Sequence, residues 1–158
     1  MNIYIFDIDG VLADLRHRLR YKNSGDFDKF YEDKNVLADG LIRPGRELLR
    51  IMNKDGFVVY ATGRPERTRR TTIEWLNENM LPMCPILMRK DGDFRQSPEI
   101  KVEQVREALE SFSNMFIADM DKVWFIDDDP KNVAAVEEAF PNEAEIKVNG
   151  LVYGTERF

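Results

Sequence analysis

The chain has 158 residues, 43% of them hydrophobic and 33% charged, as is typical of one globular domain with its own core rather than of a disordered chain. No apolar run approaches the length of a membrane span, and the net charge of −6 argues against non-specific nucleic-acid binding by the whole surface. The single cysteine, Cys84, cannot form an internal disulfide, so we expect a reducing, cytoplasmic setting.

Short apolar runs alternate along the chain with stretches of helical periodicity. We expect strands at 2–6, 56–63, 85–89, 122–129 and 144–148, and helices at 44–54, 64–80, 99–112 and 132–140. Strands that are apolar on both faces and alternate with helices predict a Rossmann-like α/β fold, with a parallel sheet covered on each side. The stretch at about 15–41 fits no sheet strand, so we expect a small helical cap insertion within a single domain spanning 1–158.

Polar side chains directly follow three of the predicted strands, and most of them are acids. They are Asp7 and Asp9 after the first strand, Thr62 near the end of the second, and Asp127, Asp128 and Asp129 at the end of the fourth. Right-handed crossovers bring the carboxyl ends of parallel strands to one edge, where ligands bind, so these side chains should meet. Clustered carboxylates repel one another unless a cation lies among them, and Mg²⁺ prefers oxygen ligands. For Asp129, followed by Pro130, a helix N-cap role fits equally well.

Four segments, in order, resemble the signature elements of the haloacid dehalogenase-like phosphohydrolase superfamily: DIDGV at 7–11, ATGR at 61–64, a lysine at the start of a helix, and FIDDD at 125–129. The resemblance implies that Asp7 is a nucleophile that forms an aspartyl-phosphate, and that Asp9 is the general acid and base. It also implies that Thr62 hydrogen-bonds the phosphoryl group and that Lys101 neutralises its charge while pairing with Asp7.

The same resemblance implies a Mg²⁺ site. Its ligands would be Asp7, the backbone carbonyl of Asp9 and Asp128, with Asp127 binding directly or through water.

A closer resemblance is to the 3′-phosphatase domain of phage-type polynucleotide kinase-phosphatases. It rests on ATGRPERTRRTTIEWL, LMRKDGDFRQSPEIK and VWFIDDDPKNVAAV. No GxxxxGK[ST] phosphate loop is present, so no kinase domain is expected. Where such phosphatases can place an aspartate one helical turn before the lysine, this chain has Ser97.

Basic residues cluster at 16–22, at 63–70 and at 88–95, each after a predicted strand. Arginine suits phosphate recognition in an otherwise acidic protein. The substrate-binding candidates are Gly63, Arg64, Arg89 and, from the first cluster, Arg18.

The aromatic residues of the insertion leave two interpretations open. Tyr21, Phe27, Phe30 and Tyr31 could stack a nucleic-acid base, or they could form the small core of the cap.

The leading hypothesis is a Mg²⁺-dependent phosphomonoesterase that removes a 3′-phosphate from a nucleic-acid end, because a short cap leaves the site open to a polymer. The alternative is a 5′-(deoxy)nucleotidase acting on nucleoside monophosphates. A receiver-like or non-catalytic phospho-binding module is a more distant alternative, since a receiver has its acidic pair first and its phospho-acceptor on the third strand. The expected partner is thus a nucleic-acid end or a nucleotide, with no membrane, and the sequence does not predict an oligomeric state.

Overall fold

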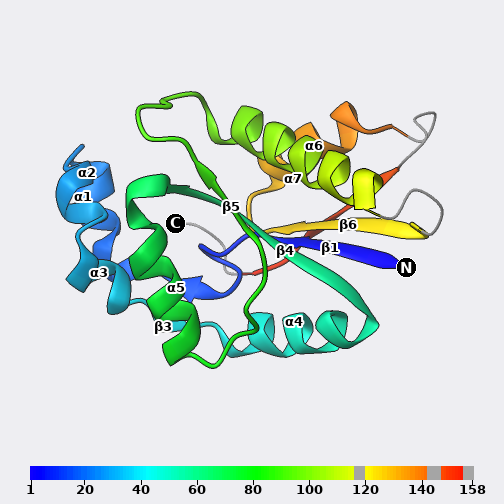
Figure 1. The fold of residues 1–158 in the computed structure, drawn as a ribbon. Helices are drawn as coiled ribbons and strands as arrows, with labels where there is room; N and C mark the ends of the chain where they lie inside the picture. The colour runs from blue at the N-terminus through cyan, green and yellow to red at the C-terminus, as the bar shows by residue number, and fades with distance from the viewer. Residues whose placement is uncertain (116–119, 142–146, 155–158) are drawn as a thin grey trace.

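A five-stranded parallel sheet forms the centre of the protein in the computed structural model, which describes residues 1–115, 120–141 and 147–154 (Figure 1). The strand order is β5-β4-β1-β6-β7. The strands are β1 (Asn2–Phe6), β4 (Gly56–Pro65), β5 (Ile86–Arg89), β6 (Lys122–Asp127) and β7 (Val148–Val152). The predicted α/β fold is therefore confirmed. Of the strand expected at 144–148, residues 144–146 lie outside the described part, and β7 begins at Val148.

Helices cover both faces of the sheet. The main helices are α4 (Arg43–Asp55), α5 (Arg69–Glu78), α6 (Ser97–Met115) and α7 (Pro130–Ala139), and a 3-10 turn, η2 (Glu66–Thr68), precedes α5. Figure 1 shows α4 and α5 on one face and α6 and α7 on the other. Pro44 lies in the first turn of α4, as the sequence predicts. The helix expected at 132–140 begins earlier, at Pro130, and of the two roles left open for Asp129 the structure shows the N-cap: its side chain accepts from the Lys131 amide at 2.9 Å.

Successive side chains of β1 belong to different cores. Tyr4 and Phe6 belong to the core that α4 and α5 complete, whereas Ile3 and Ile5 belong to the core of α6 and α7. Each buried apolar side chain contributes about 1.5–3 kcal/mol, so this central strand is held from both sides. Because Asp7 directly follows β1, the fold gives that carboxylate a rigid mount.

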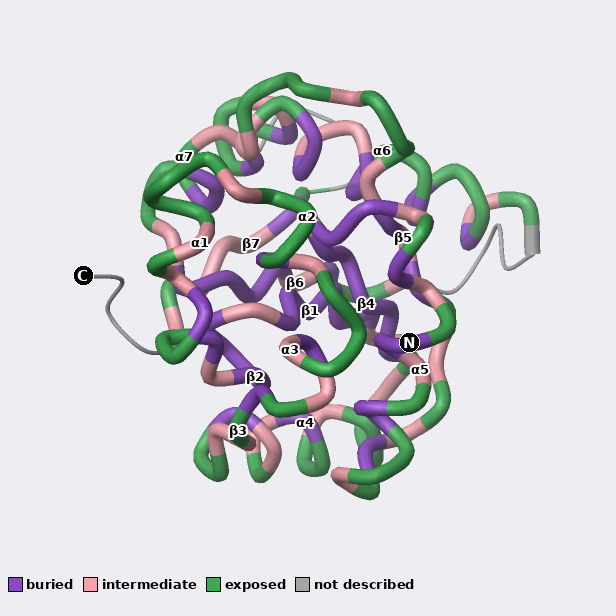
Figure 2. Tube along the Cα trace, turned by 90° about the vertical axis from the view of Figure 1, so that its left-hand side faces the viewer, coloured by how far each residue is buried: buried purple, intermediate pink, exposed green. Residues whose placement is uncertain are grey.

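The segment between β1 and α4 forms short helices beyond the carboxyl ends of the strands. They are η1 (Arg16–Arg18), α1 (Leu19–Asn23), α2 (Phe27–Phe30) and α3 (Asp33–Leu37). At the base of this segment β2 (Ala13–Asp14) pairs antiparallel with β3 (Gly40–Leu41). Figure 2 looks onto these helices, with the buried strands behind them. They therefore border the edge of the sheet where the candidate residues lie.

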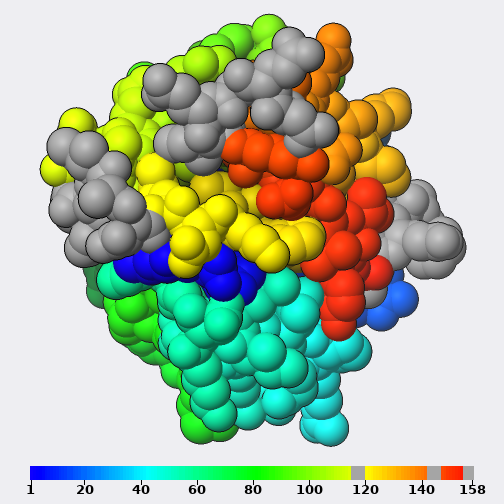
Figure 3. Space-filling model, turned by 90° about the vertical axis from the view of Figure 1, so that its right-hand side faces the viewer, coloured from blue at the N-terminus to red at the C-terminus, as the bar shows by residue number. Residues whose placement is uncertain are grey.

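The opposite end of the sheet carries none of the predicted site residues. Figure 3 shows the first residues of β1 lying between the start of β6 and the segment of α4 and β4. There the N-terminal amine pairs with the exposed Asp121. The predicted site residues thus lie at one end of the sheet only, the end where the strands finish and the short helices between β1 and α4 lie. No helix in the described residues is both long enough and apolar enough to cross a membrane.

Candidate active site

The carboxyl ends of β1, β4 and β6 bring together side chains that are far apart in sequence. Asp7 follows β1 directly, and its amide donates to the carbonyl of Ile126 in β6 at 2.8 Å. Thr62 lies near the end of β4, and Asp127 is the last residue of β6. All three side chains are buried. The sheet order therefore places the predicted residues of three strands in one cluster, as expected.

Lys101 joins this cluster from the first turns of α6. Its Nζ donates to Oδ1 of Asp7 at 2.6 Å and to the backbone carbonyl of Ala61, and it lies 3.4 Å from Oδ2 of Asp127. Only 2% of Lys101 is exposed, so carboxylates must offset its buried charge. These contacts hold the lysine although the residue one helical turn before it is Ser97 and not an acid.

The acidic residues form a possible cation site. One carboxylate oxygen from each of Asp7, Asp127 and Asp128 lies within 4.8 Å of the others, and all three residues are buried. A set of oxygen donors of this kind suits a hard cation such as Mg²⁺. Gly10 supports the fit: its φ is +87°, and a Cβ there would lie 2.1 Å from Oδ2 of Asp128. Only glycine leaves the carboxylate its place beside the turn.

Asp127 also has strong partners within the protein. Its carboxylate accepts from Asn132 Nδ2 at 3.1 and 3.2 Å and from the amide of Asp129 at 2.8 Å. These bonds fix its orientation beside Asp128, which fits either of the two metal roles predicted for it.

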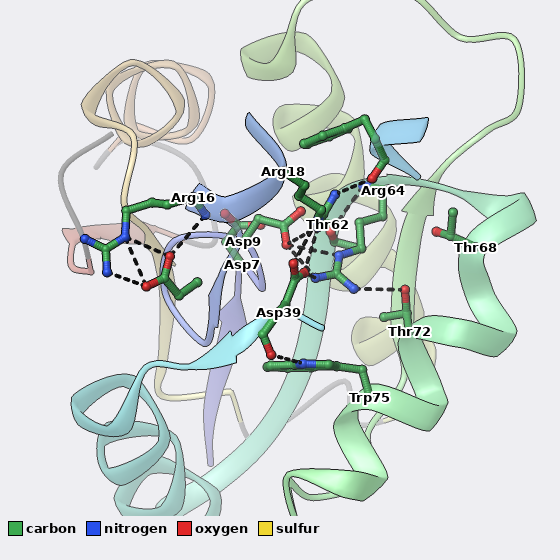
Figure 4. Close-up of polar contacts among 12 residues, drawn as sticks. Asp7, Asp9, Arg16, Arg18, Asp39, Thr62, Arg64, Thr68, Thr72 and Trp75 are labelled. Atoms are coloured by element: carbon green, nitrogen blue, oxygen red, sulfur yellow. Dashed lines mark hydrogen bonds and ion pairs between the residues drawn. The ribbon is translucent and has the colours of Figure 1, made fainter. Parts of the chain in front are cut away.

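The carboxylate of Asp9 points toward arginine. Oδ1 of Asp9 accepts from Nη2 of Arg64 at 2.6 Å and from Nε at 3.0 Å (Figure 4). Arg64 lies within an irregularity in the pairing of β4 with β5, where the register shifts between Thr62 and Pro65. Burial by itself lowers the pKa of the guanidinium, but the charges of Asp9 and Asp39 raise it by more, so the pKa of Arg64 lies above its ordinary value. Arg64 stays charged against Asp9.

Asp39 completes a buried ionic network that the sequence did not reveal. Its carboxylate accepts from Nη2 of Arg64 at 2.9 Å and from Nε and Nη2 of Arg18, both at 2.7 Å (Figure 4). His17 Nε2 lies 2.9 Å from the same carboxylate, and Trp75 donates to the Asp39 carbonyl at 2.9 Å. Nη2 of Arg18 also lies 3.7 Å from Asp9. The network thus ties the short helices before α4 to β4, to α5 and to the turn that carries Asp9.

The structure places the four substrate-binding candidates differently. Arg18 and Arg64 are both 0% exposed, so a direct contact with substrate would require the network to open. Arg89, at the end of β5, is partly buried, and its Nε donates to the carbonyl of Gly63 at 3.2 Å. The substrate contacts of all four residues stay predictions.

Thr62 is oriented by its surroundings. Its hydroxyl accepts from the amide of Arg64 at 3.2 Å, and its carbonyl accepts from the buried Gln104 of α6 at 2.8 Å. These bonds hold the threonine beside Asp7 and Lys101, where its predicted contact with a phosphoryl group requires it.

A parallel α/β sheet with this cluster at the end of its first strand defines a phosphatase of the haloacid dehalogenase-like class, which is what the sequence resembles. More specifically, the family model of the polynucleotide kinase PNKP phosphatase domain matches residues 1–135 of the chain. The chain belongs to that family of phosphatase domains.

Solved structures agree on the fold. A chain of the Pnkp1/Rnl/Hen1 complex has a TM-score of 0.62 and 21% identity, covering 98% of this chain and 47% of that one. A hydrolase from Streptococcus pneumoniae TIGR4 has a TM-score of 0.56 and 14% identity, covering 97% of this chain and 92% of that one. The HAD domain of the effector protein Lem4 from Legionella pneumophila has a TM-score of 0.53 and 16% identity, covering 99% and 88%.

The chain spans less than half the length of the chain that it matches in the Pnkp1/Rnl/Hen1 complex. A second structure of that assembly describes it as an RNA repair complex. No curated protein gives a significant sequence match.

Proposed function

We propose that this phosphatase removes a 3′-phosphate from a nucleic-acid end, using Mg²⁺ and an aspartyl-phosphate on Asp7. The observation that carries the proposal is the contact between Asp7 Oδ1 and Lys101 Nζ at 2.6 Å beside a cluster of three carboxylates. Family membership supports a nucleic-acid substrate, and the short cap supports access by a polymer.

In the first step an oxygen of Asp7 attacks phosphorus while the bond from phosphorus to the sugar oxygen breaks. Asp9 donates its proton to that leaving oxygen. Lys101 orients Asp7 and offsets charge on the phosphoryl oxygens, and the hydroxyl of Thr62 donates to one of them. Asp7, Asp128 and the carbonyl of Asp9 would hold Mg²⁺, with Asp127 bound directly or through water, and the ion would supply charge neutralisation.

In the second step Asp9, now a carboxylate, takes a proton from water. The water oxygen attacks phosphorus, the bond to Asp7 breaks, and inorganic phosphate leaves. Asp9 ends the cycle protonated, ready for the next leaving oxygen. For Arg64 and Arg18, the contacts with Asp9 and Asp39 support a positioning role, in which they aim Asp9 rather than bind phosphate.

Phosphate release tests the chemistry. We expect Asp7→Asn to lower kcat by on the order of a thousandfold or more, because an amide oxygen is a poor nucleophile. The control is Asp121→Asn, which makes the same chemical change at an exposed site at the other end of the sheet. Undiminished activity of Asp7→Asn would refute the nucleophile assignment.

A thermal-unfolding measurement tests the metal independently of turnover. Mg²⁺ should raise the Tm of the wild-type protein, because a ligand that binds only the folded state stabilises it by about 2.7 kcal/mol at a hundred times its Kd. Asp128→Asn should lose most of that rise. An equal rise in both proteins would exclude Asp128 as a ligand.

The substrate is tested by comparing a 3′-phosphorylated oligonucleotide, its 5′-phosphorylated isomer and nucleoside monophosphates. We expect the first to have the highest kcat/KM. Activity confined to nucleoside 5′-monophosphates would contradict the proposed substrate and favour a nucleotidase.

A further inference from the structure

A cleft of about 370 Å³ lies between the cap helices and the segment that joins β5 to α6. Phe27 and Tyr31 line it from the short helices before α4, Pro65 and Arg67 from the end of β4 and from η2, and Phe94 from the β5–α6 segment. In Figure 1 this segment arches over the core on the side that faces α1 and α2. Three separate parts of the chain therefore build the cleft.

Exposed aromatic rings distinguish this cleft. Phe94 is 93% exposed and Phe27 is 48% exposed, and both lie along it. Scattered apolar residues on a surface are ordinary, but two phenyl rings on separate segments of one cleft offer flat faces to a planar ligand. Phe27 also meets the buried Phe30 edge-on at 6.5 Å, which gives it a packing role, but Phe94 contributes little to the core, so folding alone gives no reason for an aromatic residue at 94.

The charge of the cleft is opposite to that of the whole protein. Its lining includes one acidic residue, Asp93, and five basic residues: Lys22, Arg67, Arg89, Lys90 and Arg95. Some of these bases have exposed carboxylate partners, such as Arg67 with Asp91 at 3.8 Å and Lys90 with Glu103 at 3.7 Å. Arg95 is held more tightly, by Asp93 at 2.6 Å and Glu103 at 2.5 Å. The longer pairs of Arg67 and Lys90 are weak, so a phosphate can replace their carboxylates.

Arg89 keeps its charge available at the inner end of the cleft. Its guanidinium donates to the backbone carbonyls of Gly63, Asp93 and Arg95, at 3.2, 3.0 and 2.7 Å. These acceptors are neutral, so they fix the orientation of the side chain without cancelling its charge.

Tyr31 and Gly63 connect the cleft to the active site. The ring centre of Tyr31 lies 5.5 Å from the guanidinium carbon of Arg67, in the cleft, and 6.0 Å from that of Arg18, in the buried network. Arg18 in turn lies 3.7 Å from the carboxylate of Asp9, so the ring of Tyr31 reaches from the cleft to the network beside the active site. Gly63, which Arg89 holds, is the neighbour of Thr62. A strand whose terminal phosphate meets Asp7 would thus leave the site along this cleft.

We propose that the cleft binds the nucleotides preceding the terminal phosphate of a single-stranded polynucleotide, with a base stacked on Phe94. This inference rests on the proposed function and narrows its substrate to an unpaired 3′ end of at least two nucleotides. A base in a duplex has its faces covered by its neighbours, whereas an unpaired base stacks readily on an aromatic side chain. The basic side chains that line the cleft would contact the phosphates of the strand. The ring of Phe27 adds a second apolar face for a nucleic-acid base.

Two substrates separate strand binding from chemistry. We expect Phe94→Ala to lower kcat/KM for a single-stranded 3′-phosphorylated oligonucleotide about tenfold more than kcat/KM for p-nitrophenyl phosphate, which is too small to reach the cleft. Ile51→Ala is the matched control, because Ile51 is 66% exposed and lies on α4, away from the cleft. It should leave the ratio of the two constants unchanged.

Stacking is also measured without turnover. Asp7→Asn protein should quench the fluorescence of 2-aminopurine placed next to the terminal nucleotide of the oligonucleotide, and adding Phe94→Ala should remove the quenching. Equal effects of Phe94→Ala on both substrates, an unquenched probe, or equal kcat/KM for a nucleoside 3′-phosphate would each overturn the inference. Failure of the wild-type protein to release phosphate from any 3′-phosphorylated oligonucleotide would instead contradict the proposed function, and the fluorescence result would still decide whether a strand binds in the cleft.

Discussion

The carboxylate of Asp9 shares its arginines with the carboxylate of Asp39. Arg64 lies 2.6 Å from Asp9 and 2.9 Å from Asp39, and Arg18 lies 3.7 Å and 2.7 Å from the same two groups. The positive charges of the two arginines balance the negative charges of the two aspartates, and buried charges need such pairing to offset the cost of leaving water. Asp39 also has a chemical consequence: an arginine favours the ionised form of a neighbouring carboxylate, and a proposed general acid must also hold a proton.

This balance leads to a prediction for Asp39→Asn. With one carboxylate removed, both guanidinium charges act on Asp9 and disfavour its protonated form. Hydrolysis of a nucleoside 3′-phosphate, whose sugar oxygen must be protonated as it leaves, should slow about tenfold or more. Hydrolysis of p-nitrophenyl phosphate should change much less, because nitrophenolate leaves without a proton. Steady-state kinetics with the two substrates measures the difference.

The control for this variant is Asp14→Asn. Asp14 pairs with Arg16 at the surface, where an ion pair contributes about 0–1 kcal/mol, so this change should affect neither substrate. If Asp39→Asn slows both substrates equally, the network is structural only and does not tune Asp9.

At the scale of elements, the residues after β7 lie against the turn that follows β1. The amide of Tyr153 donates to the carbonyl of Asp127 at 3.0 Å. A Cβ at Gly154, where φ is +132°, would lie 2.1 Å from the carbonyl oxygen of Gly10 and 3.0 Å from Cβ of Asp128. The end of the sheet's edge strand therefore supports the turn that carries Asp7 and Asp9.

Gly154→Ala should consequently destabilise the protein more than a positive φ alone explains. The comparison is Gly25→Ala, at a φ of +78° with no atom within 4 Å of the added Cβ. A positive φ costs an L-residue about 1–3 kcal/mol. At Gly25→Ala this is the whole cost, whereas Gly154→Ala also displaces Gly10. We expect its Tm to fall by several degrees more than that of Gly25→Ala, together with a smaller rise in Tm on adding Mg²⁺. If the two variants have equal melting temperatures, the segment after β7 moves to accommodate the added methyl group without displacing the turn that carries Asp7 and Asp9.

The elements themselves could be predicted from the sequence because their signals are local. Apolar runs such as 2–6 mark buried strands, and Pro44 and Asp129 mark the beginnings of helices. The placement of Asp7, Thr62 and Asp127 at one edge followed from the connectivity of parallel strands.

The buried network could not be predicted in the same way. Asp39 receives hydrogen bonds from arginines 21 and 25 residues away, and nothing in its neighbours along the chain marks it as buried. Arg18 and Arg64 belong to basic clusters that follow strands bordering the site, and arginine suits phosphate recognition, so the sequence suggested that they face the substrate. Only their three-dimensional pairing shows that they lie inside. The exposure of Phe94 could not be predicted for the opposite reason, since an aromatic residue in a sequence normally indicates a position in the core.

At the scale of the whole molecule, charge is divided between two regions. The net charge is −6, yet bases predominate along the cleft beside the active site. A polyanionic strand is therefore repelled by the protein as a whole and attracted by the cleft. At about 0.1–0.15 M salt the Debye length is about 8–10 Å, so added salt weakens the long-range repulsion. Binding of the strand at the cleft releases counterions from its phosphates, so added salt weakens that binding.

These two effects predict opposite responses to salt, so the response shows which one controls the reaction. If the strand binds along the cleft, kcat/KM for a single-stranded 3′-phosphorylated oligonucleotide should fall as KCl rises, with a log–log slope of about −0.7 for each phosphate bound. Lys90→Gln and Arg67→Gln should make the slope shallower, whereas p-nitrophenyl phosphate should show little dependence in any of the proteins. Lys54→Gln, on the far end of α4, is the control for loss of one charge. A rate on the oligonucleotide that rises with salt would mean that the net negative charge dominates, and that only the terminal phosphate is held.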